Sequence, residues 1–537
     1  MTDKGSKKPS TRLFEDSDVS SSEIHEQVDH ILNSKEFNAT DAQRSFLQYV
    51  VEKTLAGQAQ EIKGYTVATE VFGRGVDFDQ NIDPIVSIQA NKLRRALERY
   101  YFTAGINDPL RIDIPKGTYV PTFTHREAAE PDKPVTITRV PEIETESKWP
   151  TILVRPFKYL ATDSDEHHLS IGIATELAVE LSKYQDFSVI LQDPAGSGRR
   201  ISDTGVRFVI DGTIRNVGSG IRLSLYMMDA VSGTQLWGET HRCELDASSL
   251  AAFEEKVAQI VAVKVAGEYG IISYTLSQET KIKPPSELKT YEALLSFYEF
   301  DLLLTSESFT RALDALEYAA TIEPGCGQVW TKLGRLYATM YALEMPGFET
   351  ALEKAVASAQ KGVQLNPDNQ RARSILGLVR MFSNELKAAL KETEKALALN
   401  PNCLFMIDGI GYLLMLLGEW DRGRALIKKA TTLNPYHGLY VHYALWVDWI
   451  RQQKYIQADL ETLNFCRPTV FWEPLMKSAT SGLLDRIDEG RKAAQDLLSL
   501  KPDFAARGRT LIRNYIKFDD IVDRVISGLC KVGLTVD

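Results

Sequence analysis

A proline recurs at nearly constant intervals through the C-terminal half of the chain. Its positions are Pro324, Pro367, Pro401, Pro435, Pro468 and Pro502, which lie 43, 34, 34, 33 and 34 residues apart. Because proline has no backbone N–H and disfavours helix in the residue before it, each position predicts the end of a helix. A spacing of about 34 residues fits two helices and their turns, so stacked helix pairs are expected here. The longer first interval places about nine extra residues around 341–349, which predict a longer helix or a protruding loop.

Small and aromatic residues recur in step with these prolines. Trp330, Leu333, Gly334 and Tyr337 follow Pro324 by 6, 9, 10 and 13 positions. The same glycine follows two further prolines, and an alanine stands five positions before three of them: Gly377, Gly411, Ala319, Ala396 and Ala430. Small residues let two helices approach closely, and large ones fill the space beside them. Residues 289–504 resemble tetratricopeptide repeats, about six in number, which implies an all-α tetratricopeptide solenoid with a concave binding surface.

The same resemblance predicts which side chains line that concave surface. In this family, the residues 4, 7, 11 and 14 positions after the proline share one face of the first helix and point into the groove. In the two repeats that match best, these are Arg371, Ser374, Leu378, Met381, Phe405, Asp408, Tyr412 and Met415. We expect them to bind an extended or helical protein or peptide ligand. The alternative is that the large apolar members pack against the neighbouring repeat.

Residues 22–125 have the pattern of three helices followed by a β-hairpin. Asp83 and Pro84 stand at the cap and at the first position of the third and longest helix. After it, apolar and polar residues alternate from 110 to 114, and the Lys-Gly pair at 116–117 predicts the tight turn of the hairpin.

This order of elements resembles the winged-helix domains of bacterial transcription regulators. The resemblance lies in the segments DPIV, LRRALERYY and IDIPKGTYVPTF. It implies that the long helix enters the major groove of double-stranded DNA and that the hairpin is the wing. Basic side chains would contact phosphate or guanine, and Asn91 an adenine edge. The candidate DNA-binding residues are Ser87, Asn91, Lys92, Arg94, Arg95, Arg99 and Lys116.

The charge of this region supports two interpretations. Residues 22–124 carry 11 Lys and Arg against 14 Asp and Glu, whereas residues 85–116 carry six basic and three acidic residues. The positive charge is therefore local to the proposed DNA face, within an acidic surround. A cationic helix face is often only solvated, and a winged helix can also serve protein contacts. The alternative that this domain does not bind DNA therefore remains.

Residues 126–148 are rich in Glu, Pro and Thr without an apolar period, which predicts a linker. From 149 to 275, strands alternate with covering helices, which predicts an α/β sandwich. The segments VRPF and DAVSGTQLW, with the final helix, resemble the cytoplasmic TolB-like amino-terminal domain. That family implies no catalytic residues here. The last strands are candidates for edge-to-edge pairing in a homodimer.

Composition excludes several classes of protein. A hydrophobic content of 44% and a charged content of 25% are those of an ordinary globular protein. No apolar run reaches transmembrane length, and residues 1–21 are too polar for a secretory signal, so a disordered tail is expected. The five cysteines are scattered without a Cys-x-x-Cys pair, which argues against zinc and fits a reducing, cytoplasmic compartment. No phosphate loop or catalytic motif is found, so we expect no enzyme, cofactor, metal or membrane partner.

The predicted fold class is multidomain α and α/β. The domains are a tail (1–21), a winged helix (22–125), a linker (126–148), an α/β TolB-like domain (149–275), a tetratricopeptide solenoid (289–504) and a helical cap (505–537). The first functional hypothesis is a transcription regulator that binds DNA through the winged helix and a protein or peptide through the repeats. The alternative is an interaction scaffold that does not bind DNA.

Overall fold

The structure is a computed structural model in which the chain forms two compact units, Met1–Pro141 and Glu142–Asp537. The expected linker and residues 1–18 of the expected tail lie outside the described residues. The structure describes residues 19–34, 37, 39–74, 85–102, 104–105, 108–115, 117–125, 149–160, 167–184, 186–192, 205–218, 220–244, 247–267, 270–280, 283–401, 403–404, 406–434, 437–465, 467 and 469–537.

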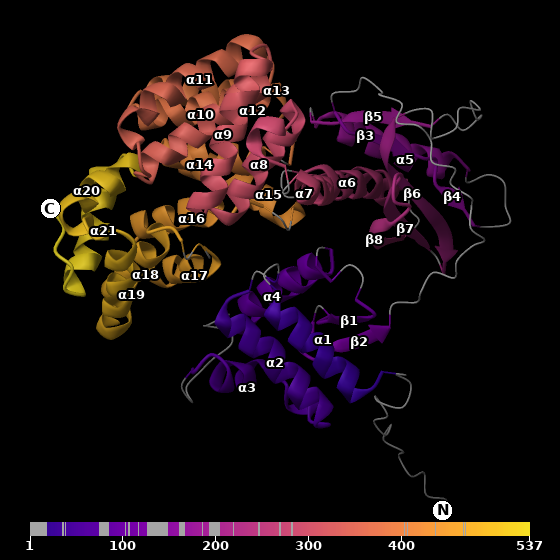
Figure 1. Cartoon of the computed structure of the whole chain (residues 1–537). Coiled ribbons are helices and arrows are strands. Elements are labelled where there is room, and N and C mark those ends of the chain that lie inside the picture. The colour runs from indigo at the N-terminus through magenta and orange to yellow at the C-terminus, as the bar shows by residue number, and fades with distance from the viewer. Residues whose placement is uncertain are drawn as a thin grey trace, which may run out of the picture. The chain divides into compact units, whose positions relative to one another are not determined.

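The described part of the first unit contains four helices and a two-stranded hairpin (Figure 1). Two of the helices begin at capping boxes, in which the side chains of Ser20 and Thr40 accept from the backbone N–H of Glu23 and Gln43. The expectation of three helices missed α1, although Ile24, Val28 and Ile31 recur at helical spacing after the capping box of Ser20. The helices are α1 (Ser21–Asn33), α2 (Asp41–Leu55), α3 (Gly64–Glu70) and α4 (Ile85–Phe102), with a 3-10 turn, η1 (Ala59–Glu61), after α2.

The hairpin joins β1 (Leu110–Asp113) to β2 (Thr122–His125), with Leu110 opposite His125 and Asp113 opposite Thr122. A turn lies where the sequence predicts it: the N–H of Thr118 donates to the carbonyl of Pro115 at 3.4 Å, and Gly117 has a φ of 90°. The strand ladder itself ends before this turn, at Asp113 and Thr122. The physical reason is the pair of prolines at 115 and 121, which have no N–H to donate and interrupt pairing on both strands.

The second unit begins with a six-stranded mixed sheet. The order of its main strands is β5-β3-β6-β7-β8, with β4 paired to β6. β3 runs parallel to β5 and β6, and β6, β7 and β8 form an antiparallel meander. Two helices, α5 (His167–Ser182) and α6 (Ala247–Ala266), pack against each other and against the sheet. The strands are β3 (Thr151–Val154), β4 (Lys158–Tyr159), β5 (Ser188–Leu191), β6 (Val206–Val217), β7 (Gly220–Asp229) and β8 (Gln235–Glu244).

A helical region follows the sheet, so the expected combination of a mixed α/β part and a helical C-terminal part is confirmed. The described residues from 290 to 500 form six helix pairs. The pairs are α8 (Thr290–Leu303) with α9 (Ser306–Ile322), α10 (Gly327–Ala342) with α11 (Ala351–Leu365), α12 (Gln370–Phe382) with α13 (Leu386–Leu399), α14 (Ile407–Leu416) with α15 (Trp420–Leu433), α16 (Tyr440–Arg451) with α17 (Tyr455–Asn464), and α18 (Trp472–Leu483) with α19 (Ile487–Leu500).

Shorter elements flank and interrupt these pairs. α7 (Ile271–Thr280) and the 3-10 turn η4 (Pro285–Glu287) precede them, and α20 (Phe504–Tyr515) and α21 (Asp519–Lys531) follow them. The sequence predicted that the extra residues of the second pair make a longer helix or a loop, and both occur. α10 is longer than α12, and the segment after α10 contains the 3-10 turn η5 (Phe348–Thr350).

Small residues bring the two helices of a pair into backbone contact. A Cβ added at Gly334 would lie 3.0 Å from the backbone N of Ala359, and one at Gly411 would lie 2.8 Å from the carbonyl oxygen of Gly423. The alanines that precede the prolines are also fully buried: Ala319, Ala396 and Ala430. The regular glycines and alanines of the sequence are therefore the close contacts between helices.

Each pair turns through one residue in the left-handed conformation. Five of these six residues are not glycine. In five of the pairs the N–H that follows reaches back five residues, as from Glu385 to the carbonyl of Arg380 and from Lys454 to that of Trp449, both at 2.9 Å. After Leu304, the N–H of Thr305 donates to the Oγ of Ser308 at 3.3 Å instead. The sequence did not predict these helix ends, because glycine is the usual signal for a left-handed residue and only one of the six is glycine. The residues are Leu304, Glu344, Asn384, Gly418, Gln453 and Asp485.

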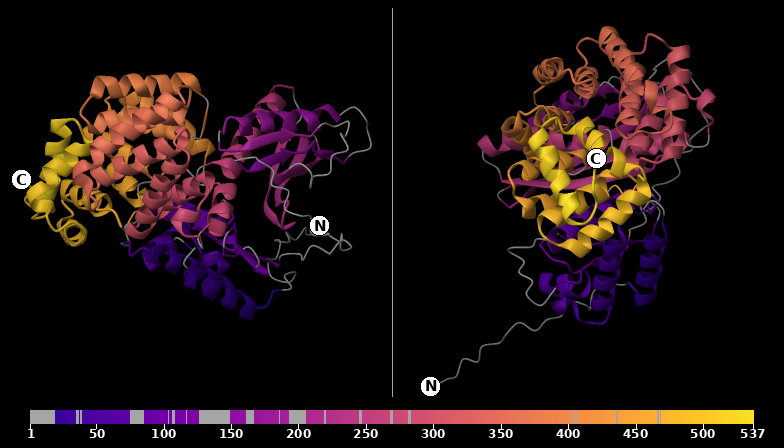
Figure 2. Two further views of the ribbon diagram at one scale, coloured as in Figure 1. Left: turned by 45° about the horizontal axis from the view of Figure 1, so that its top comes forward. Right: turned by 90° about the vertical axis from the view of Figure 1, so that its left-hand side faces the viewer.

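The C-terminal helices, yellow in Figure 2, pack on the helix pairs. α21 lies against α18 and α16, and α20 contacts α10 and α19. Arg524 of α21 donates to the carbonyls of Ile450 and Arg451 at the end of α16, both at 3.1 Å. These bonds satisfy carbonyls that the end of a helix leaves without partners.

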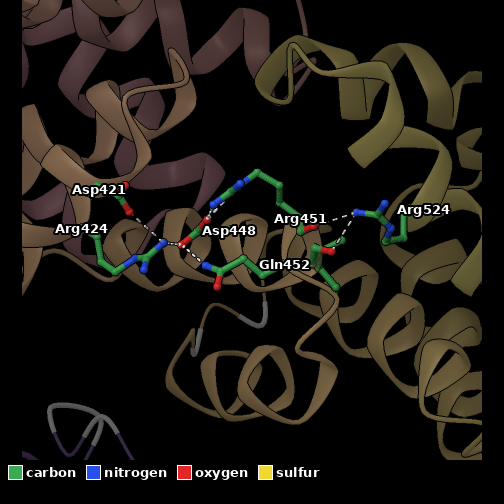
Figure 3. A network of polar contacts seen from close by, with 7 residues as sticks. Asp421, Arg424, Asp448, Arg451, Gln452 and Arg524 are labelled. Carbon is green, nitrogen blue, oxygen red and sulfur yellow. Dashed lines mark hydrogen bonds and ion pairs between the residues drawn. The ribbon is translucent and has the colours of Figure 1, made fainter.

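Asp448 organises the same end of α16 (Figure 3). Its buried carboxylate accepts from Arg424 of α15, from Arg451 at 2.7 and 2.9 Å and from Gln452 at 2.9 Å. The network thus joins consecutive helix pairs through one buried charge. Breaking such a pair leaves cations without their counter-ion.

Asp448→Ala should therefore lower the free energy of unfolding by about 2–3 kcal/mol, at the lower end of the range for buried pairs because both guanidiniums are partly exposed. Urea unfolding followed by helical circular dichroism measures this loss. Asp421→Ala is the control, since Asp421 is exposed and lies 3.9 Å from Arg424. Equal effects of the two substitutions would contradict the role of Asp448.

Candidate functional site

The first helices of successive pairs converge on one cavity of about 180 Å³ in the second unit. They are α8, α10, α12, α14, α16 and α18, joined by α20 and by Phe465, Arg467 and Val470 of the connection between α17 and α18. The lining residues are Phe297, Asp301, Leu304, Lys332, Arg335, Thr339, Leu343, Arg371, Ser374, Ile375, Leu378, Phe382, Met406, Asp408, Gly409, Tyr412, Leu413, Tyr440, Tyr443, Phe465, Arg467, Val470, Trp472 and Tyr515.

Five of the eight residues predicted for the concave groove line this cavity: Arg371, Ser374, Leu378, Asp408 and Tyr412. Met381 and Met415 are fully buried and are not among the lining residues. Met415 packs over Gly423 of α15, where the missing side chain makes room for its Cγ. Met415 therefore belongs to the contact between α14 and α15 of its own pair, whereas the alternative interpretation expected packing against the neighbouring repeat. Phe405 lies outside the described residues.

Aromatic rings form much of the cavity wall. Tyr443 lies 4.7 Å from Trp472 and 5.7 Å from Tyr515, measured between ring centroids. Trp472 and Tyr515 lie 5.2 Å apart with their rings nearly perpendicular. Such edge-to-face contacts are favourable and hold the rings in fixed orientations. Sequence reasoning missed this cluster, since Tyr515 follows the last proline and Tyr443 belongs to a repeat where the glycine pattern has faded.

Four basic residues line the cavity with two acidic ones. The Lys332 ammonium lies over the rings of Phe297 and Tyr298 at 4.2 and 4.3 Å. Arg335 lies 3.7 Å from Asp301 of α8. The basic members are Lys332, Arg335, Arg371 and Arg467, and the acidic members are Asp301 and Asp408.

One carboxylate outside the cavity ties its wall to the sheet. Asp186, which precedes β5, forms an ion pair with Arg371 at 3.1 Å. It also accepts from the hydroxyl of Tyr298 at 2.8 Å and from the amide of Gln328 at 3.2 Å. Side chains from three first helices thus meet on one residue of the sheet region, so the cavity and the sheet share a charged contact.

Early and late segments of the helical array contact each other beside the cavity. Arg467 donates to the carbonyl of Asp301 at 3.3 Å, and Thr469 donates to that of Leu304 at 3.2 Å. On α20, Asn514 accepts from the hydroxyl of Tyr341 at 3.4 Å. The concave surface is therefore closed over in these places. A cavity of about 150 Å³ admits benzene, so this one has room for a ring or a short group.

Burial keeps the tyrosines of the wall protonated. It raises the pKa of Tyr515 to about 12 and that of Tyr443 well above its ordinary value of 10. Burial also raises the pKa of Tyr412. Their hydroxyls are therefore neutral hydrogen-bond donors at physiological pH.

The proposed DNA face of the first unit is only partly as predicted. Arg94 donates to the carbonyls of Ile114, Pro115 and Thr118 at 2.7, 3.1 and 2.8 Å, and to the side chain of Asn91 at 2.9 Å. Its guanidinium therefore braces α4 against the hairpin connection, a structural role that the sequence did not reveal.

The other candidate residues of that face divide into two groups. Ser87 and Asn91 are exposed on α4, and Lys92 is half-buried. The side chains of Arg95 and Arg99, and all of Lys116, lie outside the described residues.

The described residues also bear on metals and membranes. They contain no group of three His, Cys, Asp or Glu side chains placed to hold a metal ion. Nor does that part of the chain contain a helix with both the length and the apolar character needed to cross a bilayer.

Comparison with known proteins finds matches among the curated proteins and among the solved structures. No family model matches the chain. The chain is 21% identical over 340 residues to Putative adenylate cyclase 3 of Rhizobium meliloti, across 60% of this chain and 56% of that protein, so it spans little more than half of the relative. A solved structure of Pseudomonas aeruginosa pilF matches 40% of this chain and 94% of its own length, at 16% identity and a TM-score of 0.27. At that score the likeness does not establish a shared fold.

Met415→Ala should destabilise the protein by about 2–4 kcal/mol, because it leaves a void between α14 and α15. Thermal or urea unfolding measures the loss. Met406→Ala is the comparison, since Met406 is only half-buried and lines the cavity. If Met415→Ala lowered the free energy of unfolding less than Met406→Ala does, Met415 would have to be assigned to the cavity wall and not to the helix contact.

Proposed function

We propose that the chain is a protein-interaction scaffold whose tetratricopeptide-like repeats hold a short segment of a protein or peptide partner. The observation that carries this proposal is the convergence of seven helices on one cavity with aromatic and cationic walls. Buried aromatic pockets accept the anchor residues that dominate many interfaces. Because the cavity is small, the partner contributes one or two side chains there rather than a whole helix.

We further propose that the chain acts by binding and not by catalysis. The relative in Rhizobium meliloti is named for a cyclase, but the cavity supports a different role. Its tyrosines hold their protons, and its carboxylates are engaged: Asp301 lies beside Arg335, and Asp408 accepts from the N–H of Gly409 at 2.6 Å. Groups held in this way suit recognition better than proton transfer.

A second candidate function is DNA binding by the first unit. We infer that this unit is a winged helix and that the sheet of the second unit is TolB-like, on the sequence resemblances given above. The supporting observation is that α4 exposes Ser87 and Asn91 while Arg94 braces it against the hairpin. A helix held in this way enters a groove without having to be ordered on binding.

The scaffold proposal is tested by filling the cavity. Gly409 lines it, and a Cβ there would meet one atom within 4 Å, the hydroxyl oxygen of Tyr440 at 3.5 Å. Gly409→Leu should therefore fold and project into the cavity. Peptides selected from a random display library on the full chain should bind Gly409→Leu at least tenfold more weakly, as measured by fluorescence anisotropy.

The matched control is Gly325→Leu, at an exposed turn where an added Cβ meets nothing within 4 Å. It should leave peptide affinity unchanged. Equal affinity of Gly409→Leu and wild type, with an unchanged melting temperature, would move the partner site away from the cavity. A library that yields no binding peptide would count against the scaffold.

The DNA proposal is tested on the full chain with pooled duplexes at low salt. Replacing Ser87 and Asn91 together by Ala should weaken binding by about 1–3 kcal/mol for each base-specific hydrogen bond that the substitution removes. Mobility shift across a salt series measures this, and Gln48→Ala on the exposed side of α2 is the control. A wild-type chain without affinity for any duplex would leave the scaffold as the only function.

A further inference from the structure

Two buried hydrogen-bond donors belong to residues that line the cavity and have no partner among the described residues. They are the hydroxyl of Tyr443 and the indole Nε1 of Trp472. Both side chains are 3% exposed, and they belong to neighbouring first helices, α16 and α18. Buried polar groups are nearly always hydrogen-bonded in native proteins. Two unpartnered donors on residues of one cavity wall therefore point to an acceptor that the described residues do not supply.

The charges around the cavity favour a negatively charged acceptor. Basic lining residues outnumber acidic ones by four to two. The acidic pair is also engaged: Asp408 accepts from the backbone N–H of Gly409 and Gly438, and Asp301 lies 3.7 Å from Arg335. An anion in this cavity would be attracted by the excess of cations through a low-dielectric surround.

The rest of the wall suits a flat apolar group. Eight of the lining residues are aromatic, and the rings of Tyr443, Trp472 and Tyr515 stand edge to face around one point. A further ring could take the same arrangement. The cavity, at about 180 Å³, is of the size that accepts one ring with a short substituent.

We propose that this cavity binds a small free aromatic carboxylate, whose ring lies among the aromatic side chains and whose carboxylate accepts from the hydroxyl of Tyr443 and the Nε1 of Trp472. The inference rests on the cavity of the proposed function and names the chemical group that it takes. The same chemistry could come from an aromatic residue at the carboxyl end of a partner peptide, so the test separates the two sources.

The experiment uses the full chain and four probes. They are 3-phenylpropionate, the uncharged 3-phenylpropanamide, the cation 2-phenylethylamine, and a tripeptide that ends in phenylalanine with a free carboxylate. Affinities come from isothermal titration calorimetry, backed by saturation-transfer NMR for weak binding. The carboxylate should bind at least tenfold more tightly than the amide and more tightly than the amine, and the tripeptide should bind more weakly than the free acid.

Two conservative variants test the two donors. Tyr443→Phe and Trp472→Phe each keep an aromatic ring and remove one donor, so each should weaken 3-phenylpropionate binding about tenfold, the effect of about 1.4 kcal/mol. Neither should lower the melting temperature much, because the group removed has no partner among the described residues. Tyr291→Phe is the matched control: its buried hydroxyl is also unpartnered among the described residues, but Tyr291 does not line the cavity.

Several outcomes would overturn the proposal. They are amide or amine binding as tight as the carboxylate, no binding of any probe, or no effect of either donor substitution. A tripeptide that binds tighter than the free acid would assign the chemistry to a partner protein and overturn the small-molecule source. If display peptides bind and 3-phenylpropionate does not, this inference fails and the scaffold stands. If the acid binds and no peptide does, the scaffold fails and the inference stands.

Discussion

The helical half of this protein depends on backbone contact between helices at small residues. At Gly334 and Gly411 an added Cβ would meet the partner helix at 3.0 Å or less. This spacing fixes the distance between the helices of a pair. Large side chains of the first helices therefore gather on the face that points away from the partner helix and toward the cavity. The aromatic wall of the cavity is a consequence of that division.

A second constraint is that the array closes on itself. The bonds from Arg467 and Thr469 to the end of α8, and from Tyr341 to Asn514 of α20, join segments more than 160 residues apart in the chain. An open solenoid presents a long groove to its ligand. Here the same first helices line a cavity of about 180 Å³ in which basic side chains outnumber acidic ones.

The cavity wall contains features that cost stability in the empty protein. Two donors lack acceptors among the described residues, and cations exceed carboxylates around an apolar space. Each of these features is unfavourable in the empty protein and becomes favourable when an anion occupies the cavity. Arg371 has a partner in the empty protein, because it forms an ion pair with Asp186 of the sheet region, and it also lines the cavity. An anionic ligand would compete with Asp186 for this guanidinium.

The sequence by itself determined the mixed α/β region, the helical region, the proline-ended helix pairs and five side chains of the cavity. These follow from local rules: proline ends helices, small residues permit close contact, and one helix face repeats every three or four residues. Tertiary structure decided the rest. Met415 joined the core because Gly423 makes room for it, and Arg94 was taken up by carbonyls of the hairpin connection. Tyr515 and Trp472 reached the cavity because the array curves back on itself, and curvature is the sum of small rotations between pairs that no local pattern encodes.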